Sequence, residues 1–278
     1  KYTYKHQLHI PPDRPPLDKG RQEYPIPDRA LMYQPIEDLW RPTQEHRAAY
    51  MGVEHMGQVY HLFDASLHHI RQYPGVEAAG VGLTLPYERA LNDGVQLLDG
   101  AHPMDHAQIT NLTYVTPGYF EALRFRLLQG RLIEQRDSAT STPVAIVNEA
   151  FVHHRMQDDK PIGKHLRSGK TNYEIVGVVG DVQERRAGWG AYGPIGAIPD
   201  VYLPASQFDS ASFVLVHTWF SPKWVVRAQG SDHEIARAMR NAVASVDPQL
   251  PFAEFHEMAE VRSSALSFQR LQTILLGT

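Results

Sequence analysis

The stretch from Leu112 to Val182 constrains the fold more than any other, because strand and helix signals alternate in it at short spacing. Val144–Val147 is mostly β-branched, and it ends at Asn148, a residue type that often caps a helix. Ile175–Val179 is apolar on both faces of a pleated strand, so we expect this strand to be buried on both sides. The stretch therefore predicts a strand, a short helix, a strand, a helix and a strand, in that order.

The short helix is expected to begin at Thr116. A threonine side chain accepts a backbone hydrogen bond at a helix start, and Pro117 fits the first turn, where its missing N–H costs nothing. The stretch contains no nucleophile motif, metal cluster or phosphate cradle, so it assigns no catalytic residue.

A βαβ unit is predicted near the beginning of the chain. Alternating polarity predicts a strand over Tyr2–Ile10, an apolar face of helical period predicts a helix over His46–Tyr73, and Val76–Leu83 predicts the second strand. Residues 11–42 contain eight prolines, too many for a helix or a central strand, so a long irregular excursion is expected there.

A second βαβ unit is predicted near the C-terminus. Its strands are Trp224–Arg227 and Phe252–Phe255, and its helix is Asp232–Val246, which a capping box of Ser231 and Glu234 would open. Two βαβ units that share one sheet, with both helices on one face, form the ferredoxin-like arrangement. The chain is therefore expected to have an α+β fold with two lobes: residues 1–85 and 212–278 form a discontinuous ferredoxin-like lobe, and residues 86–211 form an inserted lobe of mixed α+β structure.

A glycine-rich segment lies inside the inserted lobe. Glu184–Asp200 contains four glycines, with Trp189 and Tyr192 between them. Glycine at this density costs too much backbone entropy for a regular element, so we expect a mobile loop whose exposed aromatic side chains contact a partner. The alternative is a loop whose aromatic side chains fold back onto the lobe.

Charge and motifs exclude several classes of function. A net charge of −4 argues against a nucleic-acid surface, and the absence of cysteine excludes thiolate chemistry and a disulfide framework. Gly163-Lys164 lacks the other residues of a phosphate-binding loop, so any ATPase lies elsewhere. Fifteen histidines raise the question of a metal, but His61, His68 and His69 lack the i, i+4 spacing that grips one ion. We therefore expect solvated histidines, with no metal and no cofactor.

Seven short segments follow one another in an order that is informative as a set. They are Leu112–Phe120, Leu127–Arg131, Pro143–Ala150, Pro161–Lys164, Tyr173–Val182, Pro199–Pro204 and Val246–Pro251, and Met258 follows the last. In this order and spacing they resemble the MacB-like periplasmic core domain, the extracytoplasmic part of ABC-transporter permeases of the MacB/FtsX type. The resemblance covers the chain from about Tyr50 to its end, and residues 1–49 match only loosely.

The resemblance implies a mechanical role and no enzymatic activity. The domain would lie at the periplasmic face of the bacterial inner membrane and pass ATP-driven movement of transmembrane helices to substrate or partner proteins, for export or mechanotransmission. The implied partners are a nucleotide-binding ATPase subunit or domain, a second permease copy and a periplasmic adaptor, but no nucleic acid. Residues 1–85 and 212–278 would be the membrane-proximal, porter-like lobe.

The ends of the sequence are expected to be cuts in a longer protein. No initiating Met or signal peptide precedes Lys1, and no run approaches the ~18 apolar residues that span a bilayer. Leu271–Thr278 is either an ordinary C-terminal helix or, as the resemblance favours, the first turns of a transmembrane helix.

Two alternatives from other classes of protein stay open. A stand-alone extracytoplasmic metal-assisted hydrolase would need three or four His, Asp or Glu side chains converging in one cleft. A substrate-binding module would show a deep cleft between the lobes, with perturbed titratable groups.

Overall fold

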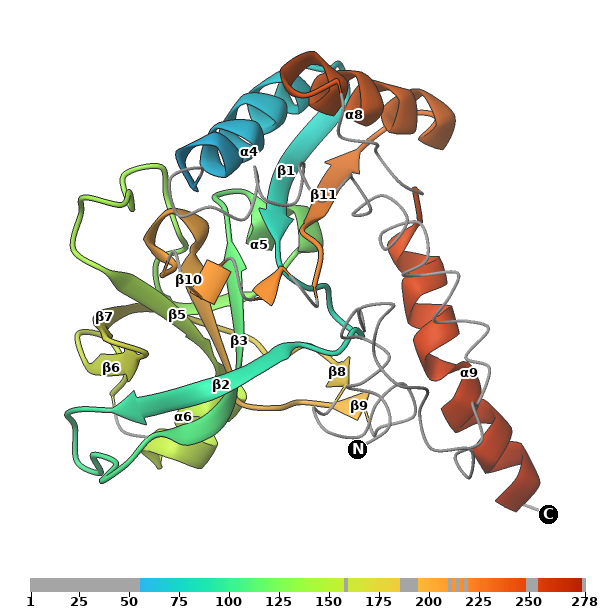
Figure 1. Ribbon diagram of the computed structural model, residues 1–278. Coiled ribbons are helices and arrows are strands. Elements are labelled where there is room, and N and C mark those ends of the chain that lie inside the picture. Colours follow the sequence, from blue (N-terminus) through green and yellow to red (C-terminus); the bar gives the residue numbers. More distant parts are fainter. Residues whose placement is uncertain are drawn as a thin grey trace, which may run out of the picture.

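The computed structural model describes residues 56–157, 160–185, 195–209, 212–213, 216–217, 220–248 and 255–276 (Figure 1). The helices are α4 (Met56–Arg71), α5 (Tyr119–Leu123), α6 (Glu149–Met156), α8 (Asp232–Val246) and α9 (Met258–Leu276), with a 3-10 turn at Ala205–Gln207. The strands are β1 (Val76–Gly82), β2 (Leu91–Leu97), β3 (Gln108–Val115), β4 (Leu127–Gly130), β5 (Val144–Asn148), β6 (His165–Ser168), β7 (Thr171–Val179), β8 (Glu184–Arg185), β9 (Ile195–Gly196), β10 (Asp200–Pro204) and β11 (Lys223–Ala228).

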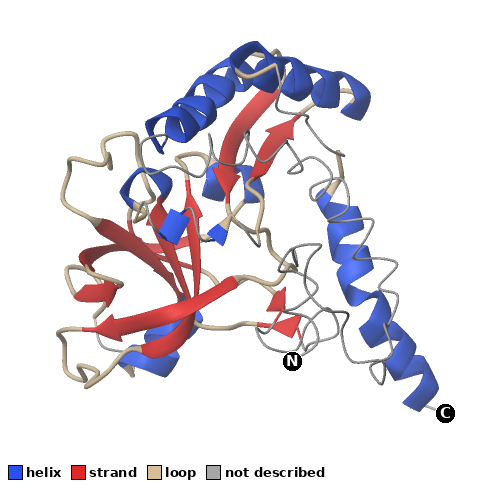
Figure 2. Cartoon of the chain, viewed as in Figure 1, coloured by secondary structure: helices blue, strands red, loops and turns tan. Residues whose placement is uncertain are grey.

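Six strands close into a barrel in the order β10-β5-β7-β6-β2-β3, with β10 pairing back to β3. The closing pair is parallel and runs from Asp200 opposite Asn111 to Pro204 opposite Val115. β4 lies outside this ring and pairs with β7. Figure 2 shows the barrel strands gathered on one side of the molecule, below the helices α4 and α8. All six strands lie within residues 86–211, where the sequence predicted mixed α+β structure but not a closed barrel.

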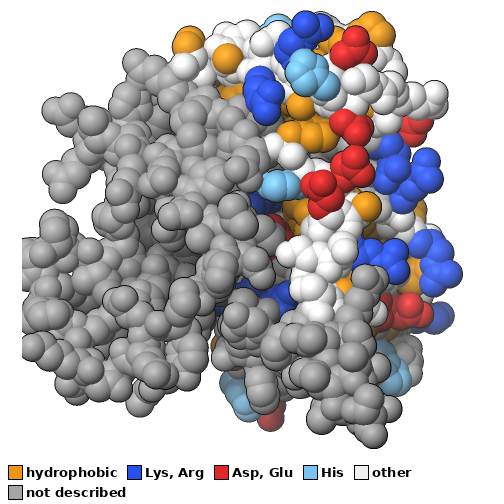
Figure 3. Space-filling view, turned by 90° about the vertical axis from the view of Figure 1, so that its right-hand side faces the viewer, with side chains coloured by type: hydrophobic (Ala, Val, Ile, Leu, Met, Phe, Trp, Pro, Cys, Tyr) orange, Lys and Arg blue, Asp and Glu red, His pale blue; other side chains and the backbone are white. Residues whose placement is uncertain are grey.

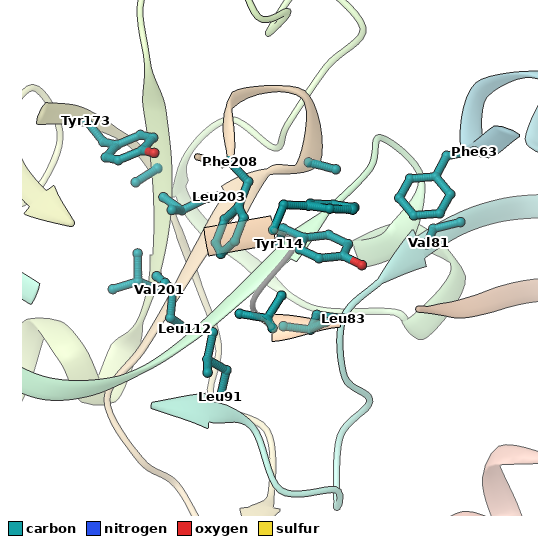
Figure 4. Close-up of a cluster of buried hydrophobic side chains, with 14 of the residues drawn as sticks. Phe63, Val81, Leu83, Leu91, Leu112, Tyr114, Tyr173, Val201, Leu203 and Phe208 are labelled. Carbon is teal, nitrogen blue, oxygen red and sulfur yellow. The ribbon is translucent and has the colours of Figure 1, made fainter. Parts of the chain in front are cut away.

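Large side chains fill the barrel interior, as expected for a ring of few strands. Tyr114 of β3 stacks on Phe213, with ring centroids 5.0 Å apart, and meets the edge of Phe208 at 5.5 Å. Figure 4 shows Tyr114 between Phe208 and Phe63, a residue of α4 whose ring centroid lies 6.2 Å from that of Tyr114. The core therefore continues from the barrel into the layer beneath α4.

The central prediction for Leu112–Val182 is confirmed at β5, α6 and β7. Asn148 ends β5 and caps α6, since its side-chain oxygen accepts the N–H of Phe151 at 2.9 Å. Ile175 and Val178 of β7 lie in the main core, whereas Val179 lies in a second buried cluster. The strand is thus covered on both faces. A bulge between Ile175 and Gly177 shifts its register against β5, so Ile175 and Val178 lie on the same face.

The predicted role of Thr116 as a helix cap is wrong. The N-cap of α5 is Gly118, at φ 91°, and no side chain makes a capping hydrogen bond there. The Thr116 hydroxyl instead accepts the N–H of Val81 in β1 at 2.8 Å. A threonine hydroxyl serves either role, and here the neighbouring strand supplies the donor.

A unit of two helices and two strands, which we call the α4–α8 unit, stands beside the barrel. β1 and β11 pair antiparallel, from Val76 opposite Ala228 to Gly82 opposite Lys223, and α4 packs against α8. Figure 1 shows both helices on one face of these strands, with α5 on the other. The predicted strands over Val76–Leu83 and Trp224–Arg227 and the predicted helix over Asp232–Val246 are confirmed.

Parts of the ferredoxin-like prediction lie outside the described residues. These are the strand Tyr2–Ile10, the proline-rich excursion over residues 11–42 and nearly all of the strand Phe252–Phe255. The boundaries at residues 85/86 and 211/212 stay a prediction. The capping box is wrong in part: Ser231 occupies the N-cap of α8, but its side chain makes no capping hydrogen bond.

α9 runs along the side of the molecule away from the barrel (Figure 1). Among the helices that the structure describes, none is long and apolar enough to cross a membrane. The side chains of residues 268–278 lie outside the description, and so does the expected exposure of the run that ends α9. Figure 3 looks onto this side, where acidic, basic and apolar side chains lie intermingled over the described surface.

Candidate functional site

The best-defined site is the junction between the α4–α8 unit and the barrel, where β1 meets β3. The two strands share one ladder pair, Gly82 opposite Val115. Hydrogen bonds extend the contact on both sides: Thr116 N–H donates to the Val81 carbonyl at 2.8 Å, and Leu83 N–H donates to the Tyr114 carbonyl at 3.0 Å. The end of β1 is therefore fixed to the end of β3, and the segment that follows β1 continues into β2 of the barrel.

Tyr119 locks this junction from the side of α5. Its ring is buried, and its hydroxyl donates to the Thr84 carbonyl at 2.6 Å. A Cβ atom on Gly80 would lie 2.3 Å from the Tyr119 backbone nitrogen, and one on Gly82 would lie 2.4 Å from its ring. Only glycine permits so close an approach. Burial raises the pKa of Tyr119 well above its ordinary value, so this side chain is a neutral donor.

Arg71 ties the end of α4 to the same junction. Its guanidinium donates to the Ala79 carbonyl at 2.8 Å and to the Pro117 carbonyl at 2.6 Å. Burial lowers the pKa of Arg71, yet a guanidinium keeps its proton at any ordinary pH. One charged side chain thus connects α4, β1 and the start of α5.

A cleft of about 330 Å³ separates α4 from two barrel loops, residues 134–138 and 204–206. One hydrogen bond crosses it, from the Gln135 amide to the Asp64 carboxylate at 3.1 Å. On the barrel side, Arg131 grips the Asp137 carboxylate through two hydrogen bonds of 2.7 and 2.8 Å. Burial alone would raise the pKa of Asp137, but these hydrogen bonds outweigh it and hold the pKa below its ordinary value. Asp137 is therefore a fixed, ionised structural group rather than a proton acceptor for catalysis.

The glycine-rich segment begins and ends in regular structure, which corrects the prediction of a wholly irregular loop. β8 pairs antiparallel with β9, with Glu184 opposite Gly196 and Arg185 opposite Ile195. Trp189 and Tyr192, the proposed partner contacts, lie outside the described residues.

A hollow of about 530 Å³ lies beside β9, between β3 and the end of α6. Ile109 lines it and is 64% exposed, a large value for an isoleucine. Arg155 of α6 donates to the Ile109 carbonyl at 2.9 Å and to the Gln108 side chain, which fixes this part of the rim.

The histidines singled out in the sequence are dispersed. His61, His68 and His69 are exposed along α4, and His68 contacts Gln72 at 2.8 Å. Within the described part of the chain, no three His, Asp or Glu side chains lie together in a way that would hold a metal ion.

Sequence reasoning missed His217, which is buried against the Tyr114 hydroxyl at 2.5 Å. Burial lowers the pKa of His217 to about 3, so it is neutral at ordinary pH. It also missed the buried carboxyl groups of Glu184 and Asp200. No local pattern marks these residues, because their partners are distant in sequence.

Comparison with protein families gives one match: the model of the MacB-like periplasmic core domain matches residues 44–244. No curated protein sequence matches the chain.

Three solved structures are similar in shape. The periplasmic region of MacB from Actinobacillus actinomycetemcomitans is 14% identical, with a TM-score of 0.48 over 75% of this chain and 82% of that one. The extracellular domain of the noncanonic ABC-type transporter YknZ from Gram-positive bacteria is 12% identical, with a TM-score of 0.44 over 65% and 81% of the two chains. A domain of a permease protein from Porphyromonas gingivalis is 17% identical, with a TM-score of 0.40 over 71% and 73%.

Proposed function

The chain belongs to the family of MacB-like periplasmic core domains, which makes it a periplasmic domain of an ABC-transporter permease-like protein, and we propose that its work is mechanical. Membership implies an ABC ATPase as a partner in the transporter complex. In our proposal, ATP-driven movement of the transmembrane helices reaches the α4–α8 unit first and is passed to the barrel, which acts on a substrate or on a partner protein.

The junction is the observation that carries this proposal. Gly80 and Gly82 let the α5 backbone and the Tyr119 ring approach β1 without any gap, so the two elements cannot slide past each other. A displacement of β1 therefore moves α5 and the end of β3 with it. Across the cleft, by contrast, the Gln135–Asp64 hydrogen bond joins exposed groups and is weak. At the edge of the cleft, the Tyr60 hydroxyl donates to the Phe208 carbonyl at 3.4 Å. Close backbone contacts and hydrogen bonds fix the junction, whereas few polar contacts between described residues cross the cleft, and this difference supports opening and closing of the cleft about the junction.

Two finer parts of the proposal concern partners. We propose that the permease acts as a dimer with a periplasmic adaptor, and that Trp189 and Tyr192 contact a partner. The position of β9, the strand paired with β8, beside a hollow with the exposed Ile109 supports a contact surface in this region.

The test measures the width of the cleft in the full-length permease, reconstituted with its ATPase. Spin labels at Asp64→Cys and Gln135→Cys report the width of the cleft through dipolar broadening. The sequence of this domain contains no cysteine, so no other site in it is labelled. Labels at Gln96→Cys and Arg167→Cys, which oppose each other on β2 and β6, form the matched control within the barrel. We expect ATP binding to change the broadening of the first pair and to leave that of the second unchanged. If neither pair responds to ATP, the cleft does not move and the mechanical proposal is wrong.

A further inference from the structure

Two carboxyl groups are buried together where β8 meets the rim of the barrel. Glu184 is 5% exposed and Asp200 is 1% exposed. The Asn111 amide donates to Glu184 Oε2 at 2.6 Å. Neither oxygen of Asp200 receives a hydrogen bond of ordinary geometry from the described residues, although the Glu184 carboxyl and the Tyr202 hydroxyl face it.

Adjacent buried carboxylates are unstable as two anions, because each loses its hydration and repels the other. Burial, and then the charge of Asp200, raise the pKa of Glu184 well above its ordinary value. Burial raises the pKa of Asp200 to about 6, although the nearby Tyr202 hydroxyl and Glu184 carboxyl act in the opposite direction. One proton shared by the pair removes the repulsion between two anions. The protonated Glu184 carboxyl can then donate a hydrogen bond to the Asp200 carboxylate, which otherwise lacks a donor of ordinary geometry among the described residues.

The described charged groups near the pair contact other partners. Asp181 adds negative charge, and its carboxylate accepts the Ala150 N–H at 2.7 Å. Glu88 lies near Tyr119, and the Glu88 carboxylate contacts the Lys223 ammonium at 3.5 Å. The Arg185 guanidinium is directed toward α9, where it donates to the Ala265 carbonyl. Tyr119 and Tyr202, whose pKa values burial raises, stay neutral.

β8 connects three parts of the molecule at this point. Arg185 N–H donates to the Glu88 carbonyl at 3.1 Å, and Tyr87 N–H donates to the Gln183 carbonyl at 2.6 Å, so β8 is joined to the segment between β1 and β2. The Arg185 guanidinium reaches the Ala265 carbonyl of α9 at 3.3 Å. The buried carboxyl of Glu184 anchors the same strand to the barrel through Asn111.

We propose that Glu184 and Asp200 hold one proton between them, and that loss of this proton releases β8 from the barrel rim and from its contacts with the β1–β2 segment and α9. This goes beyond the mechanical role and does not depend on it. Because the family is extracytoplasmic, the site would respond to the pH outside the cytoplasm.

The direction of the pH effect follows from linkage. Both carboxyls bind protons more tightly when β8 is docked than when it is released, where their pKa values are near 4. Docking is therefore complete at or below a pH of about 4 and weakens as the pH rises toward about 6, where Asp200 ionises in the folded chain. It weakens further until the pH passes the more strongly raised pKa of Glu184, where the shared proton is lost. Between the pKa of the released carboxyls, near 4, and the raised pKa values of the docked pair, the docked state holds a proton that the released state has lost, so the docking equilibrium falls by up to tenfold per pH unit.

Hydrogen exchange of the whole chain tests this, with the amides of Arg185 and Tyr87 as reporters of β8. After correction for the intrinsic pH dependence of exchange, we expect the protection of both amides to fall at least tenfold between pH 5 and pH 8. Glu184→Gln places an amide donor where the protonated carboxyl stood, so its protection should be high and independent of pH. Asp200→Asn is the second variant and should reduce the dependence without removing it, because burial alone still raises the pKa of Glu184. Asp105→Asn, which removes an exposed carboxylate, is the matched control and should behave as the wild type.

Three results would overturn the proposal. One is protection of the wild-type reporters that does not change with pH. Another is a pH dependence that survives in both Glu184→Gln and Asp200→Asn. The third is recovery of protection at pH 8 when millimolar calcium or magnesium chloride is added to the wild type but not to Glu184→Gln, because the pair would then hold a cation in place of the proton.

Discussion

At the scale of single residues, position 80 requires glycine, because the backbone of Tyr119 lies directly against it. A Cβ atom at this position would meet the Tyr119 nitrogen at 2.3 Å and the Tyr119 Cα at 2.5 Å, and backbone atoms cannot turn aside as a side chain can. We expect Gly80→Ala to lower the free energy of unfolding by about 1–3 kcal/mol, the usual cost of overpacking. Urea denaturation of the variant and the wild type measures this loss of unfolding free energy. Gly196→Ala is the matched control, since nothing lies within 4 Å of its Cβ position, and a loss as large as that of Gly80→Ala would contradict the argument.

Residue roles could be predicted where both partners are close in sequence. Asn148 caps α6 as expected, because its partner Phe151 is three residues away. Thr116 was assigned wrongly, because its partner Val81 is 35 residues away. The Asn111–Glu184 hydrogen bond spans 73 residues, so no local pattern shows that this carboxyl is buried.

At the scale of elements, Asn148 and Ser231 occupy the same position at the start of two helices but do different work. The Asn148 oxygen accepts the Phe151 and Asp200 N–H groups, each at 2.9 Å, whereas the Ser231 side chain makes no capping hydrogen bond. We expect Asn148→Ala to cost about 2–4 kcal/mol of unfolding free energy, from a lost cap and a buried N–H without an acceptor. Ser231→Ala should stay within about 0.5 kcal/mol. Thermal and urea unfolding of the two variants compare them directly, and equal losses would refute the assignment.

Strong local signals made several elements predictable. β5, β7 and α8 lie where β-branched runs and helical periodicity placed them. The prediction of an irregular glycine-rich loop was wrong at the two ends of the segment, where β8 and β9 form. These strands are stabilised by their pairing and by the burial of Glu184 rather than by the β propensity of their residues.

At the scale of the whole molecule, the closed barrel could not be predicted. β10 pairs parallel with β3 and antiparallel with β5, and these contacts join segments far apart in the chain. Apolar strands of this kind fit an open sheet equally well, since burial on both faces is all that their sequences require. The pairing of β1 with β11, by contrast, agrees with the shared sheet predicted for the two βαβ units.

Two buried sites contribute to the stability of the whole molecule, and their contributions change with pH in opposite directions. The Asp137 carboxylate, gripped by Arg131, has a lowered pKa in the folded chain, so its contribution is present above about pH 4 and is lost as the pH falls through the lowered value. Glu184 and Asp200 have raised pKa values, so their contribution is present near pH 4 and is lost as the pH rises through about 6. Stability should therefore be greatest near pH 4 and decline on both sides.

Urea midpoints measured from pH 3 to pH 9 trace this curve, and two substitutions separate its limbs. Asp137→Asn should lower the maximum and flatten the acid limb while leaving the alkaline limb in place. Glu184→Gln should flatten the alkaline limb while leaving the acid limb in place, because the two sites share no partner among the described hydrogen bonds and ion pairs. A wild-type curve that still rises between pH 6 and pH 8 would contradict the assignment of the alkaline limb to Glu184 and Asp200, since a buried carboxyl with a raised pKa cannot gain stability by ionising.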